Sequence, residues 1–277
     1  MWRGESNYGF MHQEQGRMVE RQPEATSGGA QNHPFDESYF RVGPYARVSF
    51  ARYSQYWWSN RFYATLARKH GPRGGRVLEV GCGLGHLLGW FTAPRLGGRY
   101  QVFGTDINAP ALTEARRNVP QGNFLVMSAE NLRPFEDGTF AIVIAKHVVE
   151  HLPNPEKAIA EMSRVLAPGG MLLLATPNLD SPMRGLKKEK WIGYQDPTHI
   201  SLKRPGEWLA YLRKYQFKPR KVFSDGFWDA PYVRGIPSKL QKVIFGVPGG
   251  LQAVLGWSII PLRMGESLIV IAEKVTR

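Results

Sequence analysis

The chain has 277 residues, 43% of them hydrophobic, which is enough for one α/β domain with additions. Its single cysteine, Cys82, excludes an internal disulfide framework and a thiolate metal centre, and the first residues lack the apolar run of a secretion signal, so a cytoplasmic protein is expected. The net charge is +13, and residues 181–277 carry most of it, with 17 Lys and Arg against 7 Asp and Glu. This asymmetry favours an anionic partner (an acidic substrate, a lipid surface or nucleic acid), although scattered basic residues also serve solubility.

The N-terminal part divides into two stretches. Residues 1–33 are polar and show no hydrophobic periodicity, which predicts a disordered tail. Residues 34–72 are rich in aromatic side chains, and from Phe50 onward their spacing of three and four predicts a helix that ends near Gly71-Pro72. This helix is expected to pack as a cap on the main domain, residues 73–277, although it can also roof a pocket.

Short apolar runs then alternate with helical patterns, as in a parallel sheet with crossover helices. Strands are predicted over 76–82, 100–107, 123–128, 140–146, 170–176, 219–224 and 267–274. Helices are predicted near 84–92, 109–118, 155–166 and 205–215. Asn154 is expected to cap the third of these helices, and Gly169-Gly170 to end it.

An insertion of about 227–265 separates the last two strands, and its portion Val243–Leu262 contains no charged residue. Pro248 and three glycines are expected to interrupt this portion, so a transmembrane interpretation is rejected. Two interpretations remain open: a cap over an apolar substrate, and a patch in peripheral contact with a membrane.

A glycine loop, Gly81-Cys82-Gly83-Leu84-Gly85, follows the first strand, where a ligand can approach bare backbone. His86 stands where a dinucleotide loop has its third glycine, which disfavours an NAD-dependent oxidoreductase. Glu79, just before the loop, suits a ligand with ammonium and sulfonium charge and would repel a pyrophosphate. Asp106 ends the second strand, where a carboxylate can accept both hydroxyls of a ribose, while Asn108 is better placed to cap the next helix.

Five segments follow one another in order from Val77 to Asn178: VLEVGCGLGHLL, TDIN, SAENLRPFEDGTF, AKHVVEHLPNPEKAIAEMSRVLAPGG and LLLATPN. Together they resemble the class I S-adenosylmethionine-dependent methyltransferase family, in its small-molecule branch (type 11/type 23). The resemblance implies a Rossmann-like, doubly wound α/β sheet of seven strands in the order 3-2-1-4-5-7-6, with the last strand antiparallel. It also implies S-adenosylmethionine as cofactor and S-adenosylhomocysteine as product.

The same resemblance implies the cofactor contacts. Gly81, Gly83 and Gly85, with Cys82 in the same loop, would face the methionine part, and Glu79 would support the site. Asp106 would hold the ribose, Ile107 would lie against the adenine, and Ala129 and Glu130 would lie at the adenine edge. No metal is expected.

Transfer of a methyl group to a hydroxyl is helped by a group that accepts the proton, and three histidines near strand ends are candidates. His199 lies beside Asp196, which can orient and charge-support its imidazole; alternatively it is a loop histidine bonded to that carboxylate. His147 lies at the C-terminal end of the fourth strand, where open α/β sheets bind ligands. His151 is expected to be mainly structural.

The predicted function is therefore methyl transfer to a small-molecule acceptor, at an oxygen of a hydrophobic, lipid-linked or saccharide substrate. An anionic part of it could meet Lys187, Lys188, Lys190 and Trp191, although these side chains can also simply be solvated. Two alternatives stay open. A nucleic-acid methyltransferase is supported only by the charge, because no Asn-Pro-Pro-aromatic sequence follows the fourth strand. The other is a relative that holds the cofactor without turnover.

Overall fold

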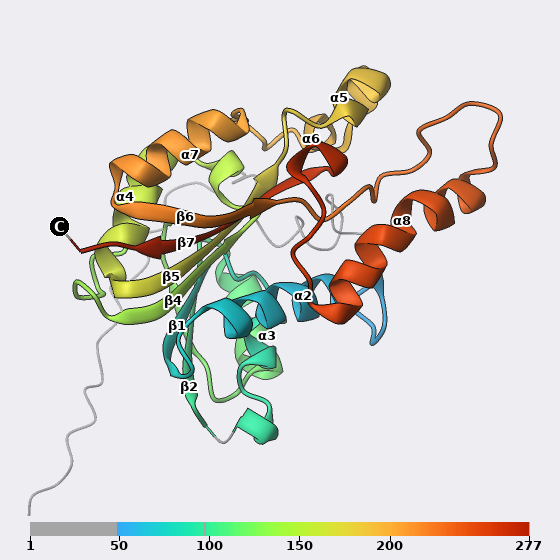
Figure 1. The fold of residues 1–277 in the computed structure, drawn as a ribbon. Coiled ribbons are helices and arrows are strands. Elements are labelled where there is room, and N and C mark those ends of the chain that lie inside the picture. Colours follow the sequence, from blue (N-terminus) through green and yellow to red (C-terminus); the bar gives the residue numbers. More distant parts are fainter. Residues whose placement is uncertain (1–48, 97, 277) are drawn as a thin grey trace, which may run out of the picture. The chain divides into compact units, whose positions relative to one another are not determined.

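The computed structural model describes residues 49–96 and 98–276, so the predicted tail over 1–33 and the start of the aromatic segment lie outside the described residues. Seven strands form one sheet (Figure 1). They are β1 (Gly75–Val80), β2 (Tyr100–Asp106), β3 (Asn123–Val126), β4 (Phe140–Lys146), β5 (Leu166–Pro177), β6 (Phe217–Phe223) and β7 (Ser267–Lys274). Their order is β3-β2-β1-β4-β5-β7-β6. All neighbours are parallel except β7, which runs antiparallel to both β5 and β6, so the predicted topology is confirmed.

Both faces of the central strands are buried, which explains their nearly continuous hydrophobic sequences. Along β4, Ile142 and Ile144 belong to one hydrophobic core, whereas Val143 and Ala145 belong to the other. This alternation is the two-residue period of a strand. The sheet therefore separates two cores that helices must cover.

Seven α-helices accompany the sheet in the described residues. They are α2 (Gln55–His70), α3 (Ala109–Asn118), α4 (Pro155–Val165), α5 (Pro182–Lys187), α6 (Ile192–Gln195), α7 (Pro205–Lys214) and α8 (Ser238–Leu255). Helices α2 and α3 supply Phe62, Leu66 and Leu112 to one core. Helices α4 and α7 supply Ile159 and Trp208 to the other, so the sheet is covered on both faces (Figure 1). The Ser54 side chain caps α2 by accepting the Trp57 backbone N–H, which explains why the helix begins at Gln55 and not at Phe50.

The prediction of a helix over 84–92 is wrong. The chain forms turns there and a single 3₁₀ turn, η1 (Leu88–Trp90). Gly85 takes a φ of +74°, in the left-handed region, which a right-handed helix cannot contain. The left-handed glycines of the loop are therefore incompatible with a helix that starts at residue 84.

The predicted ends of α4 also need correction. Asn154 occupies the N-cap position, but its side chain makes no capping bond; its backbone N–H instead donates to Glu130 at 2.7 Å. At the other end, β5 starts directly after α4, at Leu166. Gly169 and Gly170 therefore lie within the irregular beginning of β5 and do not end the helix.

The central part of the apolar insertion forms one helix, α8 (Ser238–Leu255), which continues through Pro248, while the residues on either side of it are loops and a 3₁₀ turn. The predicted interruption at Pro248 is therefore wrong, although Gly256 does end the helix, with a φ of +63°. Contacts with the domain compensate for the backbone bond that proline removes, since Gly249 and Gln252 in the following turn pack against residues 224–228. Among residues 49–96 and 98–276, no helix combines the length and hydrophobicity needed to cross a bilayer.

Candidate functional site

The glycine loop lies at the carboxyl edge of the sheet, directly after β1. Gly81 has a φ of +66°, and a Cβ atom there would lie 2.4 Å from Cγ2 of Val148. Gly85 has a φ of +74°, and a Cβ atom there would lie 3.1 Å from the Cβ of Ala115. Only glycine combines these left-handed conformations with such close packing against Val148 and Ala115, so the shape of the loop depends on glycine at both positions.

Asp106 holds this loop in place from the end of the neighbouring strand. Its Oδ2 accepts the Gly83 N–H at 2.8 Å, and its Oδ1 accepts the Asn108 N–H at 2.9 Å. Burial raises the pKa of Asp106, although these two hydrogen bonds oppose the shift. Asn108 caps α3 by accepting the Ala111 N–H at 2.8 Å, as predicted. A third backbone hydrogen bond, from Ile107, also reaches the Asp106 carboxylate. A carboxylate has about four lone-pair positions, so one remains to accept a ribose hydroxyl.

The residues predicted for the adenine lie on the next two strand ends. The backbone N–H of Met127 donates to the Asp106 carbonyl at 2.9 Å, which keeps the segments after β2 and β3 together. Ile107 is 42% exposed and Ala129 is buried. Glu130 is half-buried, and its Oε1 accepts the N–H of Asn154, which ties this segment to the start of α4. Glu130 thus has a structural partner, and its contact with adenine stays a prediction.

Glu79 lies beneath the loop in a buried polar cluster that the sequence did not reveal. Its side chain is only 4% exposed, and within the described residues its Oε2 has no hydrogen-bond partner. Lys146, on the adjacent strand β4, donates to Asn60 at 2.8 Å and lies over the Tyr56 and Tyr63 rings. Burial raises the pKa of Glu79 to about 8, a shift that the charge of Lys146 opposes. A buried carboxylate with an unused oxygen is suited to a cationic ligand.

The histidines meet beside the end of β4. His147 has a φ of +53°, and its Nδ1 lies 3.2 Å from Oε1 of the fully buried Glu150. The Nδ1 of His151 lies 2.8 Å from the Thr198 hydroxyl, and its ring centroid is 4.6 Å from that of His199. The structure therefore brings His199 together with His151 and, through Glu150, with His147.

His199 is oriented by a different group from the one predicted. Its Nδ1 lies 2.7 Å from the carbonyl oxygen of Gly193. A carbonyl only accepts, so this nitrogen carries the proton and Nε2 of the neutral ring has the lone pair. The Asp196 carboxylate accepts instead from the Thr198 backbone and hydroxyl. Burial tends to raise the pKa of Asp196, but these bonds and the charges of His199 and His151 lower it overall.

Glu150 was not predicted as a member of the site, and His151 was expected to be mainly structural. Their partners Thr198 and Ser201 lie 47 and 51 positions further along the chain, beyond the reach of local patterns. One ligand atom from each of Glu150, His151 and His199 lies within 4.8 Å of the others. Imidazole nitrogens and a carboxylate oxygen at that separation can hold a divalent cation. Whether the site is free of metal, as predicted, can therefore be tested by chelation.

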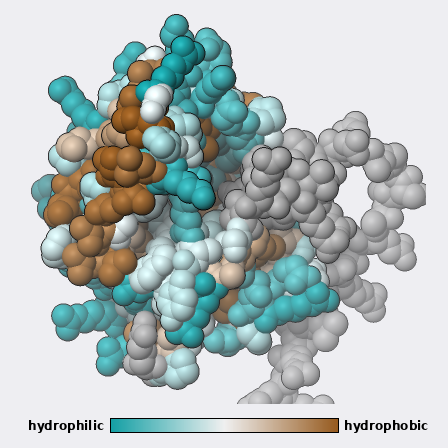
Figure 2. All heavy atoms as spheres, turned by 90° about the vertical axis from the view of Figure 1, so that its right-hand side faces the viewer, coloured by the Kyte–Doolittle hydropathy of each residue, from teal (hydrophilic) through white to brown (hydrophobic). Residues whose placement is uncertain are grey.

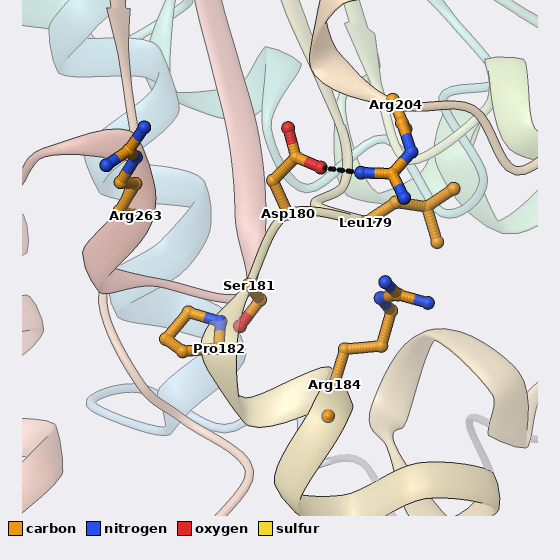
Figure 3. A pocket seen from close by; sticks show the side chains of 8 residues that line it. Leu179, Asp180, Ser181, Pro182, Arg184, Arg204 and Arg263 are labelled. Carbon is orange, nitrogen blue, oxygen red and sulfur yellow. Dashed lines mark hydrogen bonds and ion pairs between the residues drawn. The ribbon is translucent and has the colours of Figure 1, made fainter.

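A second feature of this edge is an arginine-lined pocket of about 480 Å³ just after β5 (Figure 3). Arg184, Arg204 and Arg263 line it, with Asp180 as its acidic residue. Asp180 forms an ion pair with Arg204 at 2.8 Å. Arg184 donates to the Tyr194 hydroxyl, while its Nε is buried without a partner among the described residues. The pocket thus offers more positive than negative charge.

The lysines expected near an anionic substrate behave differently from one another. Lys187 pairs with Asp229, whereas Lys188 and Lys190 are exposed. Trp191 is fully buried and donates to Glu266, so its predicted contact with substrate is wrong. The arginine pocket was missed because its members come from three separate segments, 179–185, Arg204 and Arg263.

Comparisons with known proteins agree with this geometry. Residues 78–174 match a family model described as a methyltransferase domain. Over 110 residues the chain is 40% identical to the ubiquinone biosynthesis O-methyltransferase of Xanthomonas oryzae pv. oryzae (strain PXO99A), covering 38% of this chain and 44% of that protein. Over 108 residues it is 38% identical to the phosphatidylethanolamine N-methyltransferase of Cereibacter sphaeroides, covering 37% of this chain and 50% of that protein. The alignments thus span half or less of these relatives.

The chain carries a class I S-adenosylmethionine-dependent methyltransferase domain. The solved structure of such a methyltransferase from Archaeoglobus fulgidus shares its fold, with a TM-score of 0.53 and 21% identity over 76% of this chain and 92% of that one. The residues present fit the cofactor of this domain. The carboxylate of Glu79 is buried just before the loop, and its Oε2 has no partner among the described residues, as a site for a cationic group requires.

Binding of S-adenosylmethionine to the methyltransferase domain should release protons at pH 7, because burial brings the pKa of Glu79 and that of its neighbour Lys146 both to about 8, and a cationic ligand favours the carboxylate of Glu79 and the neutral amine of Lys146. Affinity should therefore rise as the pH increases toward about 8. Calorimetry in buffers of different ionisation enthalpy measures the proton release. In the neutral isostere Glu79→Gln, affinity should fall and the release should shrink. An unchanged proton count in this variant would contradict the assignment.

Proposed function

We propose that the chain transfers the methyl group of S-adenosylmethionine to an oxygen of a small hydrophobic, lipid-linked or saccharide acceptor. The observation that carries the proposal is the position and tautomer of His199. Its loop is joined to the end of β4 by the hydrogen bond from the Ser201 N–H to the Glu150 carbonyl, at 2.8 Å. The base candidate therefore belongs to the same sheet edge as the glycine loop.

When bound, the cofactor supplies an already activated methyl group, so the protein has to align the acceptor and remove its proton. Nε2 of His199 can accept that proton, because Nδ1 is held by the Gly193 carbonyl. The charge of Asp196 interacts favourably with that of His199, and a carboxylate oxygen of Glu150 lies within 4.8 Å of a nitrogen of the same ring, so both carboxylates lower the cost of the resulting positive charge. His147, bonded to Glu150, is the second candidate for the same role.

Two observations support the acceptor class. The arginine pocket after β5 suits an acceptor with a carboxylate or phosphate, since guanidinium groups bind both. The two curated relatives are named for a ubiquinone pathway and for a phospholipid, which supports a hydrophobic or lipid-linked acceptor. Their names differ in the methylated atom, so the choice of oxygen rests on His199.

Incubation of the protein with methyl-labelled S-adenosylmethionine and fractionated host extract tests the function. We expect label in an organic-soluble or saccharide fraction that anion-exchange resin retains. Label in RNA or DNA would replace the proposal by a nucleic-acid methyltransferase. Tight binding of the cofactor with label in none of the pools would favour a protein that holds the cofactor without turnover.

In the same assay, His199→Ala should lower kcat by about 100-fold, the usual contribution of a general base, and should leave cofactor affinity nearly unchanged. His70→Ala, at the C-terminal end of α2, is the matched control and should retain activity. Equal activity of His199→Ala and wild type would assign the base elsewhere.

Dialysis against EDTA separates an imidazole base from a metal site at the same residues. We expect the rate to survive chelation. A loss that Mg²⁺ or Zn²⁺ restores would instead assign Glu150, His151 and His199 as metal ligands.

A further inference from the structure

Helix α8 has the reverse of the usual amphipathic pattern. Its buried positions include Gln241, Gly249 and Gln252, two of which are polar. Its apolar side chains point outward and are between 43% and 60% exposed; they are Leu240, Val243, Ile244, Val247, Leu251, Val254 and Leu255. A surface helix normally buries its apolar face, so this face is expected to have a partner outside the domain.

The orientation of α8 is fixed by specific contacts. Gln252 donates to the Ser224 carbonyl at 2.8 Å and accepts the Ile260 N–H at 2.9 Å. Gln241 donates to the Val233 carbonyl at 2.7 Å and accepts the Tyr232 N–H at 2.6 Å. Because both glutamines are buried and satisfied, rotating the helix would leave their polar groups unpaired. The apolar face cannot simply turn inward.

The exposed surface continues beyond the helix. Trp257 is 45% exposed and Ile259 is 65% exposed. Figure 2 shows a hydrophobic patch on the side of the molecule where α8 lies in Figure 1. The patch is thus larger than the scattered apolar side chains of an ordinary surface.

The charged side chains of the segment that contains α8 have one sign only. Residues 230–265 contain no Asp or Glu, and their four basic residues, Arg234, Lys239, Lys242 and Arg263, are all exposed. A second copy of the same surface would place like charges together. An anionic lipid bilayer offers both a hydrocarbon phase for the apolar face and negative charge for the basic residues.

We propose that α8 docks on anionic lipid bilayers, lying parallel to the membrane with its apolar face in the interface. Trp257 suits the same depth, because its ring is apolar and its N–H is polar. Docking requires neither cofactor nor acceptor, so it stands or fails separately from the proposed methyl transfer. It would also bring the sheet edge close to a lipid-linked acceptor.

Sedimentation of the full chain with phosphatidylcholine vesicles, with and without phosphatidylglycerol, tests the proposal. We expect binding to the anionic vesicles that weakens with salt. The double variant Val247→Gln, Leu251→Gln keeps the net charge, and it should weaken binding about tenfold or more. Val222→Gln, an exposed valine on β6, is the matched control and should bind like wild type.

A second variant keeps the test independent of helix stability. Lys239→Gln with Lys242→Gln changes two exposed side chains and should weaken binding to anionic vesicles selectively. Absence of wild-type binding to either vesicle would overturn the proposal. So would a dimer that forms without lipid and is lost in the Val247→Gln, Leu251→Gln variant, because the face would then join two copies of the chain.

Discussion

The hydrogen bonds of the Asp106 carboxylate are the constraint on which the cofactor side of the domain depends. One oxygen holds the Gly83 N–H and the other holds the Asn108 N–H. The glycine loop is otherwise attached by few bonds, such as that from the Cys82 N–H to the Thr105 carbonyl. A loop whose glycines take left-handed conformations loses much entropy on ordering, and the hydrogen bonds of one half-buried carboxylate offset part of that cost. The side chain expected to bind ribose therefore also shapes the cradle beneath it.

The acceptor side depends on contacts between distant parts of the chain. The side chain of Glu150 is hydrogen-bonded to the His147 ring, and its backbone carbonyl accepts the Ser201 N–H. One buried residue thus joins the end of β4 to the loop that contains His199. A further buried carboxylate, Glu266, accepts from Trp191 and from the Tyr232 hydroxyl at 3.0 Å. It thereby anchors the segment before α6 and the segment before α8. Both carboxylates position the loops from which the acceptor would be recognised.

The sequence predicted what local patterns determine. The strands were recognisable because both faces of the sheet are buried, and Asn108 capped α3 as expected. The failures have physical causes. Gly85 takes a left-handed conformation where a helix was predicted, so the chain forms turns there. Helix α8 continues past Pro248, because Gln252 in the following turn is held by a hydrogen bond to the Ser224 carbonyl. Two hydrogen bonds of the site, Lys146 with Asn60 and His151 with Thr198, join positions that are far apart in sequence. No periodic pattern in the sequence can predict such pairs. Residue type, position relative to the strands and the family resemblance predicted Asp106, Glu79 and His199 as site residues, but they could not give the partners of these side chains.

Calorimetric titration of S-adenosylmethionine into wild-type protein and Asp106→Ala tests the central claim most directly. The wild type should bind one cofactor per chain, and the variant should bind about tenfold more weakly or worse, since it loses charge-assisted hydrogen bonds to the ribose and the support of Gly83. Circular dichroism should show the same folded sheet in both proteins. Equal affinity in a folded Asp106→Ala variant would contradict the placement of the cofactor at this strand end.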